Sequence, residues 1–199
     1  MTLHMNRLRT QLRGVLGLMG QSEVERLALL ASQVRREHAI VEIGSWTGCS
    51  ATWLAMGARA GRRAHVTAVD LYPEPRPGSR DDEEGIGTAG AIARFRANID
   101  RFGLWSDVTL LRGASVDVAP MWMQPIGLLF DDATHTFEAL RDDYEAWSRH
   151  IAPGGWLALH DHNETDYPGV PQGVREFILP TGEWEDVSLT ESLWTARKR

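Results

Sequence analysis

The sequence predicts an α/β fold: a doubly wound, mostly parallel, seven-stranded sheet with helices on both faces and a C-terminal antiparallel hairpin. Two observations lead to this expectation. Short β-branched runs alternate with segments of helical periodicity along most of the chain. This alternation implies right-handed crossovers between parallel strands. The last two strand-like runs lie close together in the sequence, which is typical of a hairpin.

Each element follows from a local pattern of apolar residues. The expected strands span 39–43, 65–69, 108–111, 126–130, 156–159, 185–189 and 192–196. The expected helices span 23–36, 51–59, 88–102, 134–150 and 172–179. Ser22 and Glu25 have the spacing of a capping box before the first helix, and Pro153-Gly154-Gly155 is expected to stop the fourth. Residues 72–87 are rich in proline and glycine, so a long loop is expected there.

Length, charge and composition limit the kinds of protein to consider. The 199 residues suit one domain. The formal net charge of -6 argues against a general nucleic-acid binder. The sequence has no apolar stretch long enough to span a membrane and no signal-peptide pattern at its start, so a cytoplasmic location is expected. The single cysteine, Cys49, cannot form an intramolecular disulfide and is expected to be a packing residue.

Polar residues gather at four of the predicted strand ends. They are residues 42–50, Asp70, residues 131–135 and residues 160–163. Parallel sheets bind their ligands beyond the carboxyl ends of the strands. We therefore expect one site, built from these four segments.

The first two segments indicate a cofactor that contains adenosine. Gly44 and Gly48 allow a sharp turn after the first strand. Three residues separate them, which differs from the dinucleotide fingerprint and counts against a nicotinamide cofactor. Asp70 ends the second strand, where a carboxylate can accept hydrogen bonds from both ribose hydroxyls.

Two longer motifs resemble those of class I S-adenosylmethionine-dependent methyltransferases. They read Val41-Glu42-Ile43-Gly44-Ser45-Trp46-Thr47-Gly48-Cys49-Ser50 and Val66-Thr67-Ala68-Val69-Asp70. A further stretch narrows the resemblance to the group of macrocin-type sugar O-methyltransferases and cephalosporin-hydroxylase-like proteins. It reads Phe130-Asp131-Asp132-Ala133-Thr134-His135-Thr136-Phe137-Glu138, with Pro153-Gly154-Gly155 and His160-Asp161 downstream. The resemblance covers roughly residues 38–165 and implies a Rossmann-like fold, with which the C-terminal hairpin agrees. We therefore expect a methyltransferase domain over residues 38–199, preceded by a helical segment, residues 1–37, that packs on it.

The resemblance also implies roles for individual residues. Those expected around the methionine portion of the cofactor are Glu42, Gly44, Ser45, Thr47, Gly48 and Ser50. Asp70 would hold the ribose, and Leu71, Ala114 and Ser115 would border the adenine. Asp131 or Asp132 would lie under the methionine amino group or reach the acceptor.

Asp132, His160 and Asp161 are the expected ligands of a divalent metal. The resembling group uses acidic residues at these positions to chelate a metal that binds the hydroxyls of the acceptor, and this chain departs from it at His160. A mixed set of carboxylates and imidazoles suits Mg²⁺ or Mn²⁺. Strand alternation would send His160 and His162 to one side and Asp161 to the other. Whether a metal is needed stays open at this point.

His135 is the expected general base, with Asp132 as the second catalytic residue. An imidazole can take a proton from an acceptor hydroxyl near neutral pH. The alternatives are that His135 only packs and that Asp161 only orients a histidine.

Together these features predict a methyltransferase that uses S-adenosylmethionine to methylate a hydroxyl of a small metabolite, of the sugar or natural-product type. Two alternatives remain: a regulatory protein that binds a nucleoside cofactor without catalysis, and a nicotinamide-dependent oxidoreductase. A small-molecule acceptor is the expected partner, with neither nucleic acid nor membrane. We expect the acceptor pocket to be built from the N-terminal segment, loop 72–87 and loop 162–171, and a contribution from a second subunit leaves a homodimer open.

Overall fold

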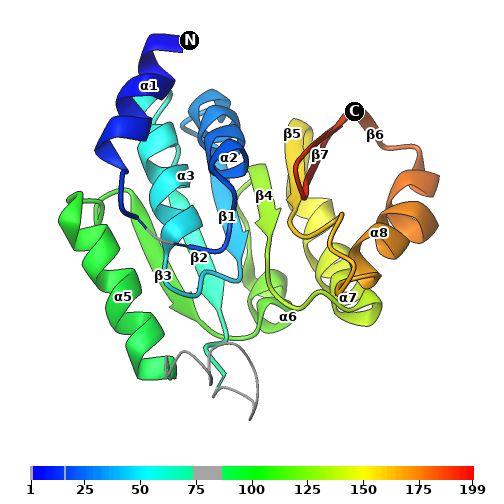
Figure 1. Cartoon of the computed structure of the whole chain (residues 1–199). Coiled ribbons are helices and arrows are strands. Elements are labelled where there is room, and N and C mark those ends of the chain that lie inside the picture. Colours follow the sequence, from blue (N-terminus) through cyan, green and yellow to red (C-terminus); the bar gives the residue numbers. More distant parts are fainter. Residues whose placement is uncertain (1, 16, 74–86) are drawn as a thin grey trace.

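The computed structural model describes residues 2–15, 17–73 and 87–199. Within these residues, the centre is a seven-stranded sheet with the strand order β3-β2-β1-β4-β5-β7-β6 (Figure 1). The strands are β1 (Ala39–Ile43), β2 (Val66–Asp70), β3 (Val108–Arg112), β4 (Ile126–Asp131), β5 (Ile151–Leu159), β6 (Trp184–Thr190) and β7 (Leu193–Lys198). Strands β1 to β5 pair in parallel, whereas β7 pairs antiparallel with β5 and β6. The predicted fold class is therefore confirmed.

Helices cover both faces of this sheet (Figure 1). The helices of the first face are α1 (Thr2–Gln11), α2 (Gln21–Gln33), α3 (Cys49–Ala60) and α5 (Thr88–Arg101). Those of the second face are α6 (Ser115–Val118), α7 (Phe137–Trp147) and α8 (Gly169–Gly173). Short 3₁₀ turns at Ala119–Met121, Ser148–His150 and Leu179–Thr181 and a π-turn at Val174–Ile178 complete the helical elements described.

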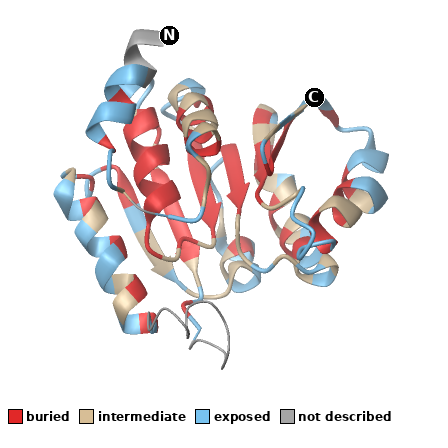
Figure 2. Cartoon of the chain, in the orientation of Figure 1, coloured by how far each residue is buried: buried red, intermediate tan, exposed pale blue. Residues whose placement is uncertain are grey.

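The core has one layer on each side of the sheet. Ile40 and Leu128 pack with residues of α2, α3 and α5, while Val41 and Leu129 pack with residues of α7 and α8. Strands β1 and β4 are buried along their whole length (Figure 2), as expected for central parallel strands covered on both faces.

The first 37 residues contribute to this core. Leu8 and Leu12 belong to the same buried cluster as the residues of α2 and α3. The division of the chain at residue 37 stays a prediction. Among the residues described, no helix is both long and apolar enough to cross a membrane.

Strand β5 differs from the prediction. It begins at Ile151 and contains Pro153-Gly154-Gly155, which the sequence analysis placed before the strand. Pairing with β4 shifts from Ile126 opposite Ile151 to Leu128 opposite Trp156, so the extra residues bulge out between these pairs. A Cβ on Gly155 would lie 2.9 Å from the carbonyl oxygen of Ile126. The glycine is needed because two backbones approach closely there.

Helix boundaries also shift at polar caps. Helix α7 begins at Phe137 instead of 134 because Thr136 caps it, its hydroxyl accepting from the Ala139 amide at 3.2 Å. Helix α2 begins at Gln21 after the N-cap residue Gly20, whose amide donates to the Glu23 carboxylate, so the predicted pair of Ser22 and Glu25 does not form the cap. The helix predicted over residues 172–179 is longer than expected, because helical turns run from Gly169 to Thr181.

Candidate functional site

A cleft of about 1170 Å³ opens at the carboxyl ends of the parallel strands. Most of the predicted site residues line it, although they come from separate strand ends. They are Gly44, Ser45, Thr47, Ser50, Asp70, Leu71, Ala114, Ser115, Asp132, His135, His160 and Asp161. Glu42, Gly48 and Asp131 are near these segments but do not line the cleft.

The turn between β1 and α3 requires both of its glycines. Gly44 and Gly48 have φ angles of +81° and +78°, in the left-handed region that favours glycine. A Cβ on Gly44 would lie 2.4 Å from the carbonyl oxygen of Asp132, and one on Gly48 would lie 2.6 Å from the Phe95 ring. The turn therefore packs directly against the segment after β4.

Asp70 organises this turn through its carboxylate. Oδ2 accepts hydrogen bonds from the backbone amides of Ser45 at 2.7 Å and Trp46 at 2.8 Å. Oδ1 accepts from the amide of Tyr72 at 2.6 Å. The predicted ribose ligand thus also holds the backbone of the glycine turn and of the segment after β2, a role that the sequence did not reveal.

Glu42 lies behind the glycine turn and is fully buried. Neither carboxylate oxygen has a hydrogen-bond partner among the residues described. Burial raises the pKa of Glu42 to about 8, although the nearby hydroxyls of Ser50 and Ser45 counteract part of this effect. The group is therefore held largely as the neutral acid at neutral pH.

Asp131 is buried at the end of β4 and does not itself line the cleft. Its carboxyl is buried near Asp143 of α7, and burial together with this second carboxyl raises the pKa of Asp131 well above its ordinary value. The Ser115 hydroxyl donates to Asp143, so the predicted adenine-bordering residue is tied to the same pair. A role of Asp131 at the methionine portion stays a prediction.

Four side chains meet at the loops after β4 and β5. Ligand atoms of Asp132, His135, His160 and Asp161 all lie within 4.8 Å of one another. Asp161 has a φ of +59°, so the chain turns there and strand alternation ends. The prediction that Asp161 would point away from His160 is therefore wrong. Instead, the His162 ring leaves the group and stacks on Trp194.

His160 is almost completely enclosed by carboxylates. Its Nδ1 lies 2.9 Å from Asp132 Oδ1 and 3.3 Å from Asp161 Oδ1, and its Nε2 lies 3.2 Å from Glu23 Oε2. Burial disfavours the charged ring, but these hydrogen bonds outweigh it and raise the pKa of His160 to about 12. Burial likewise opposes ionisation of Glu23, yet its bonds from His160, Ser192 and Gly20 lower the pKa to about 2.

His135 forms the wall of the cleft next to this group. Its Nε2 makes a hydrogen bond of 3.4 Å with Asp132 Oδ1 and lies 3.1 Å from Asp161 Oδ2. Its ring packs on Tyr167, with 4.4 Å between the ring centroids. Although burial favours the neutral acid of Asp132, hydrogen bonds from His135 and His160 lower the pKa of its carboxyl.

The chemistry of this donor set fits a divalent cation. Two carboxylates and two imidazoles converge from two loops, which is a ligand combination found for Mn²⁺ and iron as well as Mg²⁺. The group contains the three predicted metal ligands and also His135, which the sequence analysis had assigned only to catalysis.

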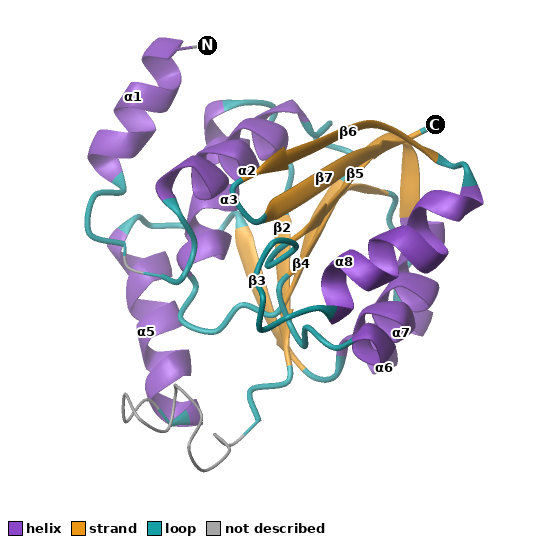
Figure 3. Ribbon diagram, turned by 45° about the vertical axis from the view of Figure 1, so that its right-hand side comes forward, coloured by secondary structure: helices purple, strands orange, loops and turns teal. Residues whose placement is uncertain are grey.

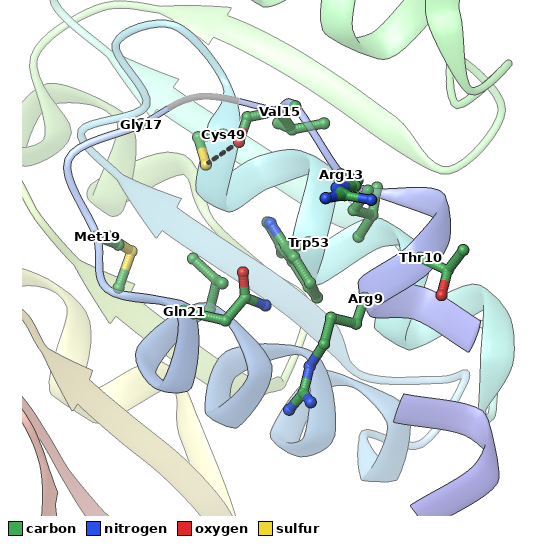
Figure 4. Close-up of a pocket in the computed structure, with 12 residues that line it drawn as sticks. Arg9, Thr10, Arg13, Val15, Gly17, Met19, Gln21, Cys49 and Trp53 are labelled. Atoms are coloured by element: carbon green, nitrogen blue, oxygen red, sulfur yellow. Dashed lines mark hydrogen bonds between the residues drawn. The ribbon is translucent and has the colours of Figure 1, made fainter. Parts of the chain in front are cut away.

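The N-terminal segment supplies residues that the motifs did not reveal. Glu23, at the start of α2, contacts His160 from a position 137 residues earlier in the chain. Gly17 and Met19 line both the cleft and a second cavity of about 530 Å³ between α1, α2 and α3. Figure 4 shows Trp53 and Cys49 at this second cavity, with the Cys49 sulfur facing the Val15 carbonyl at 3.8 Å.

Cys49 is unsuited to act as a nucleophile. The side chain is buried, and burial raises the pKa of its thiol to about 12, with the charges of Glu42 and Asp132 adding to the effect. A thiolate is the reactive form of cysteine, so this residue packs, as predicted.

A glycine turn and an acidic strand end that share one cleft are features of sheets that bind adenosine-containing cofactors. A family model described as methyltransferase domain matches residues 41–162, more than half of the chain. The chain belongs to this family, and it is a methyltransferase. The prediction of a class I methyltransferase is confirmed, and the family implies S-adenosylmethionine as the methyl donor.

Solved structures show the same fold at low sequence identity. The O-methyltransferase NovP is 18% identical with a TM-score of 0.73, covering 90% of this chain and 80% of that one. The cofactor-bound protein Rv0187 from MTB is 19% identical with a TM-score of 0.64, covering 99% and 90%. The calicheamicin methyltransferase CalS11 is 15% identical with a TM-score of 0.65, covering 98% and 91%.

Proposed function

We propose that this methyltransferase transfers the methyl group of S-adenosylmethionine to a hydroxyl of a small metabolite, of the sugar or natural-product type. One observation carries the proposal: the group of Asp132, His135, His160 and Asp161 lines the same cleft as the glycine turn. Groups that can bind and deprotonate a hydroxyl thus lie beside the place expected for the methyl donor. The names of NovP and CalS11 as methyltransferases of this fold agree with the proposal.

In this proposal, the cofactor would occupy the cleft between the glycine turn and the end of β3. Gly44, Ser45, Thr47 and Ser50 would hold its methionine portion, Asp70 would hold the ribose, and Leu71, Ala114 and Ser115 would border the adenine. The support is that all of these residues line the cleft. Glu42 and Gly48 act from behind the turn, by shaping it.

His135 is proposed to remove the proton of the acceptor. Carboxylates only accept hydrogen bonds, so Nε2, which faces Asp132 and Asp161, carries the proton of the neutral ring. The lone pair is then on Nδ1, which has no hydrogen-bond partner among the residues described. Transfer from a sulfonium is an in-line displacement, so the protein must mainly position the hydroxyl and accept its proton.

Asp132, His160 and Asp161 are proposed to hold a divalent cation, Mg²⁺ or Mn²⁺, which would replace the proton on Nδ1 of His160. A cation held by these three residues would supply Lewis-acid chemistry that favours the deprotonated form of an acceptor hydroxyl. Asp132 also faces His135, so the same carboxylate would connect the metal ligands to the base. The net charge of -6 favours a small acceptor over nucleic acid.

The proposal is tested by calorimetry and by methyl transfer. Wild-type protein should bind S-adenosylhomocysteine and should methylate at least one member of a panel of sugars, phenols and hydroxy acids. Asp132→Asn should retain binding of the homocysteine compound and lose transfer by at least about 100-fold. The matched control is Asp142→Asn, the same change at an exposed position on α7.

Adding EDTA separates the two parts of the proposal. Loss of transfer with EDTA, restored by Mn²⁺, supports the metal, whereas unchanged transfer leaves His135 as the base without it. Equal transfer by Asp132→Asn and wild type would contradict the proposed site. A wild-type protein that does not bind S-adenosylhomocysteine would contradict the proposed cofactor position.

A further inference from the structure

Glu23 joins three separate parts of the molecule through one buried carboxylate. Oε1 accepts hydrogen bonds from the amide of Ser192 at 2.8 Å and from its hydroxyl at 2.6 Å. Oε2 accepts from the amide of Gly20 at 2.7 Å and lies 3.2 Å from His160 Nε2. Only 2% of Glu23 is exposed. The carboxylate thus connects the start of α2, the turn between β6 and β7, and the end of β5. Figure 3 labels these helices and strands.

This contact determines which side of the His160 ring faces the group of four. A carboxylate has no proton to donate, so the hydrogen bond to Glu23 requires a proton on Nε2. The opposite nitrogen, Nδ1, is therefore directed at Asp132 and Asp161. With Nε2 held in this way, the ring has little freedom to rotate away, because His160 is only 5% exposed.

The arrangement has the form of a metal-site histidine and its orienting carboxylate. A histidine that binds a metal commonly donates its other ring N–H to a carboxylate, which fixes the tautomer and the ring orientation. Here Glu23 stands at the position of that second partner, while Nδ1 lies 2.9 Å from Asp132 Oδ1 and 3.3 Å from Asp161 Oδ1.

We propose that Glu23 is a positioning residue for the reaction centre, which holds His160 so that Nδ1 faces Asp132 and Asp161. This inference rests on the proposed function of that centre. It also connects the centre to the N-terminal segment, because Glu23 holds Gly20, and Gly17, Met19 and Gly20 line the cleft. The residue that orients His160 therefore also fixes the end of an N-terminal segment that lines the cleft.

The direct test is the imidazole ¹H–¹⁵N correlation spectrum of the full-length protein. In the wild type, Nε2 of His160 should give the signal of a protonated, hydrogen-bonded ring nitrogen. Glu23→Gln places an amide there, so the His160 ring signals should shift or exchange. Glu25→Gln is the matched control, because it makes the same change two residues further along α2, where the carboxylate pairs with Arg9 instead. Unchanged His160 signals in Glu23→Gln would overturn the proposal.

The functional readouts are affinity for Mn²⁺ alone, measured by calorimetry, and kcat of methyl transfer. Glu23→Gln should weaken each by about 10- to 100-fold, the usual effect of losing such a partner, while affinity for S-adenosylhomocysteine changes little. Glu25→Gln should leave all three as in the wild type. Thermal unfolding of each variant distinguishes loss of function from loss of fold, and Glu23→Asp, which keeps a carboxylate, should recover part of the loss.

A double-mutant cycle shows whether Glu23 acts through His160. The losses of Glu23→Gln and His160→Asn should be far from additive if they act as a unit. Additive losses would overturn the proposal. The spectrum and the double-mutant cycle test the role of Glu23. Wild-type binding of S-adenosylhomocysteine and wild-type methyl transfer test the proposed function, so the two proposals can fail separately.

Discussion

The pKa values of the two buried glutamates Glu23 and Glu42 shift in opposite directions, because their surroundings offer different hydrogen-bond partners. Glu23 accepts hydrogen bonds from two backbone amides and a hydroxyl and faces His160, and these contacts lower its pKa to about 2 despite burial. Glu42 has no hydrogen-bond partner among the residues described, and burial raises its pKa to about 8. The first is held as a charge at the reaction centre, and the second as a neutral acid behind the cofactor turn. Residue type alone does not reveal this difference.

We expect Asp70→Asn to weaken cofactor binding by at least about 10-fold. The carboxylate accepts three backbone hydrogen bonds that shape the cleft, and an asparagine places N–H groups against one of these donors. Loss of a charged hydrogen bond costs about 1.5–3 kcal/mol. Titration calorimetry with S-adenosylhomocysteine measures the effect. The control is Asp100→Asn, on the exposed side of α5. Equal affinities of the two variants for S-adenosylhomocysteine would contradict this role of Asp70.

We expect His135→Ala to lower kcat by about 10²- to 10⁴-fold, the usual contribution of a general base. Affinity for S-adenosylhomocysteine should change little, because His135 lies on the side of the cleft with Asp161 and Tyr167. His162→Ala is the matched control, since His162 stacks on Trp194 away from the group of four. Steady-state kinetics with a methylated acceptor measure both variants. A His135→Ala enzyme with wild-type kcat would show that another group takes the proton.

The sequence predicted most of the residues at the reaction centre but not their arrangement. Asp132, His135, His160 and Asp161 could be placed together because parallel strands end at one edge of the sheet. The orientation of Asp161 could not, because it depends on a left-handed backbone conformation after the end of β5. Glu23 was missed because its contact with His160 spans 137 positions and has no local pattern.

At the scale of elements, helices α2 and α3 pack closely at a glycine. A Cβ on Gly57 of α3 would lie 2.3 Å from the carbonyl oxygen of Ala28 in α2. Alanine is ordinarily the better helix residue by about 1 kcal/mol. Here the added methyl group would force the helices apart, so the packing should outweigh the propensity.

We therefore expect Gly57→Ala to destabilise the protein, by about 1–3 kcal/mol, as is typical of overpacking. Denaturant unfolding measures the change. Ala97→Gly is the reverse substitution at an exposed position of α5, and it should cost about 0.5–1 kcal/mol from propensity alone. Stabilisation by Gly57→Ala would mean that the two helices are not held at this distance.

Apolar periodicity predicted the existence of these elements better than their ends. The central strands β1 and β4 are buried on both faces, so their apolar runs were clear. The ends depend on polar caps and on close backbone approach. Thr136 caps α7, so this helix begins later than predicted. Gly155 permits a close backbone approach, so β5 includes the residues that were predicted to precede it.

At the scale of the whole molecule, the cleft results from the strand order. The strand order changes direction between β1 and β4. These two strands are neighbours in the sheet, although β2 and β3 separate them in the chain. The glycine turn after β1 and the group after β4 consequently meet, with Gly44 against the backbone of Asp132. Alternation of strands and helices predicted a doubly wound sheet, whereas the insertion of β7 between β5 and β6 follows from pairings that no local pattern encodes.

The stability of the whole protein should depend on pH through Glu42. Its pKa is about 8 in the fold against an ordinary value of 4.5, so the folded state retains a proton that the unfolded chain loses. This contribution to the free energy of unfolding is fully present below about pH 4.5 and is lost as the pH rises through about 8.

The side chain of the Glu42→Gln variant stays neutral throughout this pH range. The variant should therefore gain stability relative to the wild type between about pH 5 and pH 9, by at most about 5 kcal/mol. Urea unfolding at both pH values measures this gain, with Glu37→Gln as the exposed control. A difference between Glu42→Gln and wild type that does not change with pH would mean that Glu42 has a partner that compensates its charge.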